Sequence, residues 1–119
     1  MTKKIPDFED PRYWNSTIRM SMSKFFILCA LTERPLHGYD VTAEVEQRTQ
    51  GFCSPGEGTI YPVLKQFAQG GYVTVHSETI SGRVRKVYTI TDRGRRAYNV
   101  GLAEWQKVTA CLQTCCVAA

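Results

Sequence analysis

The sequence lacks the features that define several whole classes of protein. Its longest hydrophobic run extends only from Phe25 to Leu31, well short of the roughly 20 apolar residues that a membrane-spanning helix needs. No hydrophobic stretch follows the basic residues near the N-terminus, so we expect no secretory signal, a cytoplasmic location and no membrane contact. Repeats and low-complexity segments are also absent. The 119 residues suffice for one domain of ordinary size but not for two independent cores.

Catalytic motifs are missing as well. The chain contains no Walker loop, no dinucleotide fingerprint and no paired carboxylates in a recognisable setting. Its two histidines, His37 and His76, lie outside any hydrolase or metalloprotease motif, and no local signature joins a histidine to a cysteine nucleophile. We therefore predict that the chain is not an enzyme and requires no cofactor.

The composition is that of a folded domain with an uneven charge. Hydrophobic residues make up 43% and charged residues 22%, as in ordinary globular proteins. The net charge is +4, but residues 1–62 hold seven basic and eight acidic side chains (net −1), whereas residues 63–119 hold eight and three (net +5). A basic field concentrated in one half indicates a phosphate-facing surface, with a solvated basic face as the alternative.

Apolar periodicity predicts helices in the first part of the chain and after a central hairpin. Spacings of three and four residues indicate helices from about Trp14 to Leu31 and from about Gly38 to Thr49. β-Branched and aromatic residues then predict two strands, residues 72–80 and 84–90, joined by a turn at Ser81-Gly82. After the hairpin, a threonine at position 91 can cap a long final helix.

A third helix between these regions has the clearest period. Gly70-Gly71 ends it, but its start is ambiguous. Ser54 could begin it through a capping box, which would place Pro62 in the helix interior, whereas a start at Thr59 leaves the proline in the tolerated first turn. The predicted core residues of this helix are Ile60, Val63, Leu64, Phe67 and Ala68.

The final helix carries apolar residues at alternating spacings of four and three, which is typical of a coiled-coil-like seam. Leu102, Trp105 and Leu112 are its candidate dimerisation residues. Because the other helices are needed for the core of the domain, we expect the same helix of a second copy to cover this seam in a two-fold homodimer.

Together these elements predict an α+β, mainly α fold: a winged helix-turn-helix with a long C-terminal dimerisation helix. The third helix is the element expected to enter a DNA major groove. We expect a flexible N-terminal leader at residues 1–13, a winged helix-turn-helix DNA-binding domain at 14–90, and a C-terminal dimerisation helix with a cysteine cluster at 91–119.

Five motifs follow one another in this region: LTERPLHGY (31–39), GTIYPVL (58–64), GYV (71–73), GRVRKVY (82–88) and TITDRG (89–94). In order and spacing they resemble the PadR family of bacterial transcriptional repressors, over roughly Phe25 to Trp105. The resemblance implies a homodimer that binds an inverted repeat in double-stranded operator DNA and is released by a ligand. The single helix after the hairpin resembles the smaller, PadR-like subgroup.

Candidate DNA-binding residues lie first on the third helix. Ser54, Thr59, Tyr61 and Lys65 occupy its start and polar side, where hydroxyl and ammonium groups can reach phosphates or base edges. Capping and solvation are the alternative roles, above all for Ser54. The resemblance to the family implies that Tyr61, the tyrosine of the Thr-Ile-Tyr-Pro motif, contacts DNA.

The wing supplies a second set of candidates. Arg83, Arg85 and Lys86 would bind phosphates independently of sequence, or place an arginine in the minor groove. Three further arginines, at positions 93, 95 and 96, begin the last helix, where they either face phosphate or are merely solvated.

Cysteine placement suggests an effector site. Five cysteines are an odd number, so we expect reduced thiols rather than a disulfide framework. Cys111 and Cys115 are i, i+4 neighbours on one helix face, and Cys116 lies about 100° further round. Three soft thiolates suit a thiophilic metal or metalloid such as arsenite, antimonite, cadmium or mercury. The alternative is that these cysteines, like Cys29 and Cys53, only pack.

Three other hypotheses remain open. An aromatic or phenolic inducer could be held between subunits, stacked in an apolar slot formed by Trp105 with Trp14 and Phe8. A thiol redox sensor could form an intersubunit disulfide through the terminal cysteines. A protein adaptor that binds no DNA could use the seam for partners. For either kind of inducer, binding at the last helix would change the angle between subunits and misalign the two recognition helices.

Overall fold

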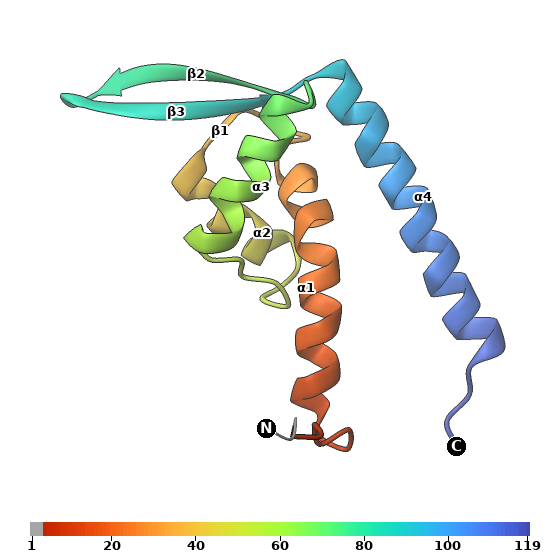
Figure 1. The fold of residues 1–119 in the computed structure, drawn as a ribbon. Helices are drawn as coiled ribbons and strands as arrows, with labels where there is room; N and C mark the ends of the chain where they lie inside the picture. Colours follow the sequence, from red (N-terminus) through yellow and green to blue (C-terminus); the bar gives the residue numbers. More distant parts are fainter. Residues whose placement is uncertain (1–3) are drawn as a thin grey trace.

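The computed structural model describes residues 4–119, so residues 1–3 of the predicted leader lie outside the described part. In chain order, the elements are α1 (Pro11–Ala30), β1 (Leu36–His37), the 3-10 helix η1 (Gly38–Asp40), α2 (Val41–Arg48), α3 (Glu57–Gln69), β2 (Val73–Ile80), β3 (Arg83–Ile90) and α4 (Asp92–Cys115). The β2–β3 hairpin projects from one end of the helices, and α4 leaves the sheet and descends beside α1 (Figure 1).

The first two helices begin differently from the prediction. α1 starts at Pro11, three residues earlier than Trp14, because the Asp10 carboxylate accepts a hydrogen bond from the Arg12 backbone N–H and the proline occupies the first turn. The second predicted helix is divided, since Gly38–Asp40 forms a 3-10 turn before α2.

Neither expected start of α3 is right. The helix begins at Glu57, with Gly56 at the N-cap. The Ser54 hydroxyl donates to the Glu46 carboxylate instead of capping the helix, and Thr59 lies inside the first turn. Pro62 therefore stands in the helix interior, where it has no N–H to donate to the preceding turn. The predicted end at Gly70-Gly71 is confirmed, with the Tyr72 N–H returning to the Phe67 carbonyl at 2.9 Å.

The hairpin and its turn follow the prediction, but the sheet has one more strand. β2 and β3 pair antiparallel from Val73↔Ile90 to Ile80↔Arg83. Ser81 (φ 51°) and Gly82 (φ 78°) both adopt positive φ, as a tight type I′ turn requires. The missed strand is β1, which pairs with β3 and places β3 in the centre of the sheet.

The helices and the base of the sheet share one hydrophobic core. Of the five core residues predicted for α3, Ile60, Leu64 and Phe67 are buried, and Val63 and Ala68 pack against the core. The other buried members are Ile27, Leu28, Ala30, Leu31, Leu36, Val41, Val45, Cys53, Val73, Tyr88 and Ile90. This packing of three helices and a hairpin is a winged helix-turn-helix, which confirms the predicted fold class.

The start of α4 is held tightly against the end of α3. Thr91 caps the helix by accepting the Gly94 N–H, and its hydroxyl also donates to the Gly71 carbonyl at 2.7 Å. Further along α4, Tyr98 stacks on Phe25 of α1, with ring centroids 5.4 Å apart. The expectation that only a second copy covers the seam is therefore wrong for its first half.

The rest of the chain leaves most of the far half of α4 uncovered. Trp105 still reaches Phe25, with ring centroids 6.4 Å apart, and Leu102 is half-buried, but Leu112 is 56% exposed. Of the helices in residues 4–119, none is long and apolar enough to cross a membrane.

Gly94 offers a direct test of this attachment. A Cβ at this position would overlap the Tyr72 carbonyl oxygen and lie 2.6 Å from Cγ1 of Ile90. We expect Gly94→Ala to lower the free energy of unfolding by about 2–3 kcal/mol in urea denaturation, because backbone must move to relieve the clash. Gly58→Ala, which meets nothing within 4 Å, should leave stability unchanged or slightly raised. Equal effects of the two substitutions would contradict this packing.

Candidate nucleic-acid interface

The outward face of α3 is set by its buried face. Because Ile60 and Leu64 point into the core, their neighbours Tyr61 and Lys65 project outward, one helical turn apart. Tyr61 is 41% exposed despite its large ring. A tyrosine hydroxyl and a lysine ammonium thus stand on the same exposed side of the helix, and both can bind phosphate or base edges.

This face of α3 and the near face of the wing form a groove. One cleft of about 330 Å³ is lined by Gly38, Tyr39, Tyr61, Val84, Arg85, Lys86 and Tyr88. A second, of about 470 Å³, is lined by Tyr61, Lys65, Ala68, Gln69, Val75, Lys86 and Tyr88. The two share Tyr61, Lys86 and Tyr88, and we call them together the α3–wing groove. Three cations and no carboxylate line it, so its electrostatics favour an anion.

Close packing seats Tyr61 in this groove. A Cβ on Gly38 would lie 2.8 Å from Cε1 of Tyr61 and 3.3 Å from Cε2 of Tyr88, so only glycine allows the Tyr61 ring this approach. Burial raises the pKa of Tyr88 above its ordinary value, and the nearby Tyr61 raises it further. The Tyr88 hydroxyl is therefore neutral at physiological pH and adds no negative charge to the groove.

The structure brings together four of the seven predicted DNA-binding residues. Tyr61, Lys65, Arg85 and Lys86 line the groove, and Arg83 is exposed at the start of β3, beside the hairpin turn. Thr59 is exposed on the first turn of α3. Ser54 lies apart: it lines a separate depression with residues of α1, and its hydroxyl is bonded to Glu46.

The basic run beyond the wing has a different role. Arg93 donates to the Gly70 carbonyl at 2.7 Å, with its guanidinium 4.5 Å from the centre of the Tyr72 ring. Arg95 donates to the Thr32 carbonyl at 2.9 Å. Both arginines fasten α4 to the rest of the domain, which sequence reasoning did not anticipate because their partners are distant backbone carbonyls.

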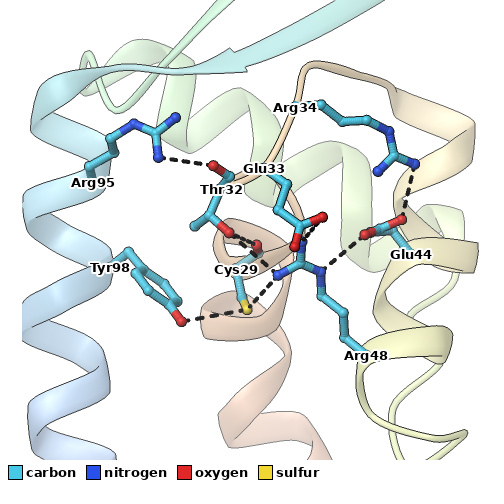
Figure 2. Close-up of polar contacts among 8 residues, drawn as sticks. All are labelled: Cys29, Thr32, Glu33, Arg34, Glu44, Arg48, Arg95 and Tyr98. Atoms are coloured by element: carbon cyan, nitrogen blue, oxygen red, sulfur yellow. Dashed lines mark hydrogen bonds and ion pairs between the residues drawn. The ribbon is translucent and has the colours of Figure 1, made fainter.

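A polar junction ties α1, α2 and α4 together (Figure 2). Arg48 of α2 reaches the Cys29 sulfur in the last turn of α1 at 3.5 Å and the hydroxyl of Thr32, just after α1, at 3.4 Å. The Cys29 thiol in turn contacts the Tyr98 hydroxyl of α4 at 3.9 Å. Cys29, for which the sequence suggested only packing, thus joins α1 to α4.

Glu44 anchors the other side of Arg48. Its carboxylate accepts from Arg48 Nε at 3.1 Å and from Arg34 at 3.2 Å, and its side chain is only 10% exposed. The Arg48 hydrogen bond, assisted by Arg34, lowers the pKa of Glu44 below its ordinary value.

The cysteine cluster at the end of α4 is exposed to solvent. Cys111 and Cys115 are exposed on the helix, and Cys116 follows its last residue. Hydrogen bonding with the Thr114 hydroxyl, and then with Cys111, lowers the pKa of Cys115, which favours its thiolate. Within residues 4–119, however, no three His, Cys, Asp or Glu side chains are arranged to hold a metal ion.

The predicted aromatic slot does not form within the chain. Trp14 packs with Phe8, their ring centroids 6.1 Å apart, and its indole N–H donates to the Phe8 carbonyl. Trp105 instead contacts Phe25, three turns further along α1. Eleven residues of helix separate the two tryptophan environments on α1, so a slot that joins Trp105 to Trp14 and Phe8 would have to form between subunits.

Comparison with known proteins relates the chain to transcriptional regulators. The family model described as "Transcriptional regulator PadR-like family" matches residues 27–100. The "Negative transcriptional regulator PadR" of Bacillus subtilis (strain 168) is 33% identical over 91 residues, which are 75% of this chain and 50% of that protein. The chain thus spans half the length of this curated relative.

Solved structures share the fold. A transcriptional regulator from Clostridium thermocellum superposes with a TM-score of 0.75 at 20% identity, covering 85% of this chain and 99% of that one. Bacillus subtilis PadR in complex with operator DNA gives a TM-score of 0.61 at 30% identity, covering 68% of this chain and 47% of that one.

The Glu44 contacts predict a pH-dependent stability. Because folding lowers the Glu44 pKa, the stabilisation is present above the unfolded value of about 4.5 and is lost as the pH falls through the folded pKa. Glu44→Gln should therefore cost about 1–3 kcal/mol at pH 7 and much less near pH 3, measured by urea denaturation.

A matched control is Glu33→Gln. Glu33 also faces Arg48, at 3.4 Å, but its side chain is 72% exposed, so we expect a small effect. A Glu44→Gln cost that stays constant from pH 7 to pH 3 would show that the charge is not what stabilises the junction.

Proposed function

The chain belongs to the Transcriptional regulator PadR-like family, and on this basis we propose that it is a homodimeric repressor that binds operator DNA through the α3–wing groove. The family consists of transcriptional regulators, which confirms the prediction that the chain is not an enzyme. The observation that carries the proposal is the groove itself, where Tyr61 and three cations stand together without a carboxylate.

The geometry suits a duplex. α3 is the helix that a winged helix-turn-helix inserts into the major groove, and Tyr61 and Lys65 project from its exposed side. The wing extends beyond the core with nearly all of β2 exposed, so Arg83 and Lys86 can contact the DNA phosphates beside the major groove. The Bacillus subtilis relative, solved with operator DNA, supports operator DNA as the partner.

The exposed apolar face of the long helices supports a homodimer. Val108 and Leu112 on α4 and Ile18 on α1 are each at least 45% exposed, which is costly for a chain that stays alone. A two-fold axis along these helices would present two copies of α3 to half-sites one helical turn, roughly 34 Å, apart. An inverted repeat is the matching operator.

DNA binding is tested by fluorescence anisotropy with the reduced protein and duplex DNA from upstream of its own gene. We expect affinity to fall steeply with salt, because lysine and arginine contacts release counterions. Tyr61→Phe should lower affinity for this duplex by about 1–3 kcal/mol while leaving binding to a scrambled duplex unchanged. Arg83→Ala should weaken binding to both duplexes and make the salt dependence shallower.

Lys107→Ala is the control for lost charge. Lys107 lies on the distal part of α4 and pairs with Glu104, away from the groove, so its removal should leave affinity unchanged. Binding that is insensitive to salt, to Tyr61→Phe and to Arg83→Ala would reject the repressor and favour a protein adaptor.

For the effector, we propose a thiophilic metal or metalloid, with arsenite as the probe. Cys111, Cys115 and Cys116 are exposed, and the lowered pKa of Cys115 favours metal ligation. Since no three ligands converge within the described chain, cysteines of both subunits would complete the site. Three thiols and one arsenite then form three As–S bonds and release three waters, and the ligated α4 ends set a new angle between subunits.

Stoichiometric arsenite should release the wild-type protein from its operator in the same anisotropy assay. Cys115→Ser should abolish this release, whereas Cys53→Ala should retain it, because Cys53 is buried beside α3 and outside the cluster. Release that survives Cys115→Ser would overturn the metalloid site. Indifference to arsenite would turn the search to oxidants or to an aromatic inducer held by Trp105 between subunits.

A further inference from the structure

One edge of the α3–wing groove is built from a stack of planar groups. The His37 and Tyr39 rings lie nearly parallel, with an interplanar angle of 10° and centroids 5.7 Å apart. The Arg85 guanidinium lies over the Tyr39 ring, 4.5 Å from its centre. The stack therefore links β1, η1 and β3, three elements that meet at the base of the wing.

The His37 end of this stack is anchored in the sheet. His37 belongs to β1, where it pairs in register with Val87 of β3, and its side chain is 21% exposed. Its two ring nitrogens lie 3.5 Å from carboxylate oxygens of Asp40 and Glu78. Tyr39 therefore rests on a ring whose backbone is fixed by sheet pairing and whose two nitrogens face carboxylates.

The Arg85 end of the stack carries a cation whose hydrogen-bond donors are free. Within residues 4–119, Arg85 makes no hydrogen bond and no ion pair, although Glu78 is its register partner on β2. The ring supports one face of the guanidinium while its N–H donors remain available at the groove. By contrast, Arg93, which stacks on Tyr72, donates a hydrogen bond to the Gly70 carbonyl.

We propose that Tyr39 is a positioning residue for DNA binding: it holds the Arg85 guanidinium, backed by His37, in the orientation that receives a DNA phosphate. This rests on the proposed function. An arginine ordered before binding loses less side-chain freedom on contact, and its planar fork suits phosphate oxygens. Tyr39 acts through Arg85, so its hydroxyl is not required.

A double-mutant cycle measured by DNA anisotropy tests this role. Tyr39→Leu should weaken operator binding about two- to fivefold, the range expected for losing an exposed cation–π contact. Tyr39→Phe keeps the ring and should bind as the wild type does. In an Arg85→Ala background Tyr39→Leu should have no further effect, whereas in an Arg83→Ala background it should keep its full effect, because Arg83 makes no such stack.

Arg85→Lys tests the same point without altering Tyr39. It keeps the charge but not the planar fork, so it should weaken binding as much as Tyr39→Leu, and the two together should be no worse than either. Additive effects would overturn the proposal, as would a Tyr39→Phe loss equal to that of Tyr39→Leu, which would assign a DNA contact to the hydroxyl. If the wild type shows no salt-sensitive binding at all, the proposed function itself fails.

Discussion

The burial of one face of α3 is the constraint on which the interface depends. Ile60, Leu64 and Phe67 fill the centre of a core shared with α1, α2 and the sheet. With 3.6 residues per turn, burying these positions leaves no freedom in where Tyr61 and Lys65 point. The recognition surface is therefore a consequence of core packing, and Gly38 completes it by letting the Tyr61 ring approach the backbone.

The same compact core fixes how α4 leaves the domain. Gly94 packs against the Tyr72 carbonyl, and Arg93 and Arg95 bond to backbone carbonyls of the α3 end and the loop after α1. The Arg48 junction then connects α2, the end of α1 and Tyr98 of α4 (Figure 2). A change in the direction of α4 must therefore strain these contacts, which lie next to the helices that support α3. The contacts thus physically connect α4 with the helices packed against α3.

Sequence patterns predicted the features that local chemistry controls. Periodicity identified the buried face of α3, and the Ser81-Gly82 turn and the Thr91 cap follow from residue preferences at those positions. The two-residue strand β1 is too short to show a period, so it was missed. It could only be recognised from its partner β3, more than forty residues away.

The site was predicted in part for the same reason. Charge and helix period proposed Lys65, Arg85 and Lys86, and the family resemblance added Tyr61; all four line the groove. The hydroxyl of Ser54 is instead bonded to Glu46, a residue of another helix. Tyr39 was overlooked because its importance arises from His37 and Arg85, which the fold brings to either end of its ring. Long-range contacts of this kind leave no signal in local spacing.

Hydrogen–deuterium exchange with and without duplex DNA from upstream of the gene would locate the DNA-binding surface. We expect new protection in the exposed wing, residues 79–86, and in the first turns of α3, with the distal half of α4 unchanged by DNA at fixed protein concentration. Protection confined to α4, with the wing and α3 exchanging as in the free protein, would contradict the α3–wing groove as the DNA-binding surface.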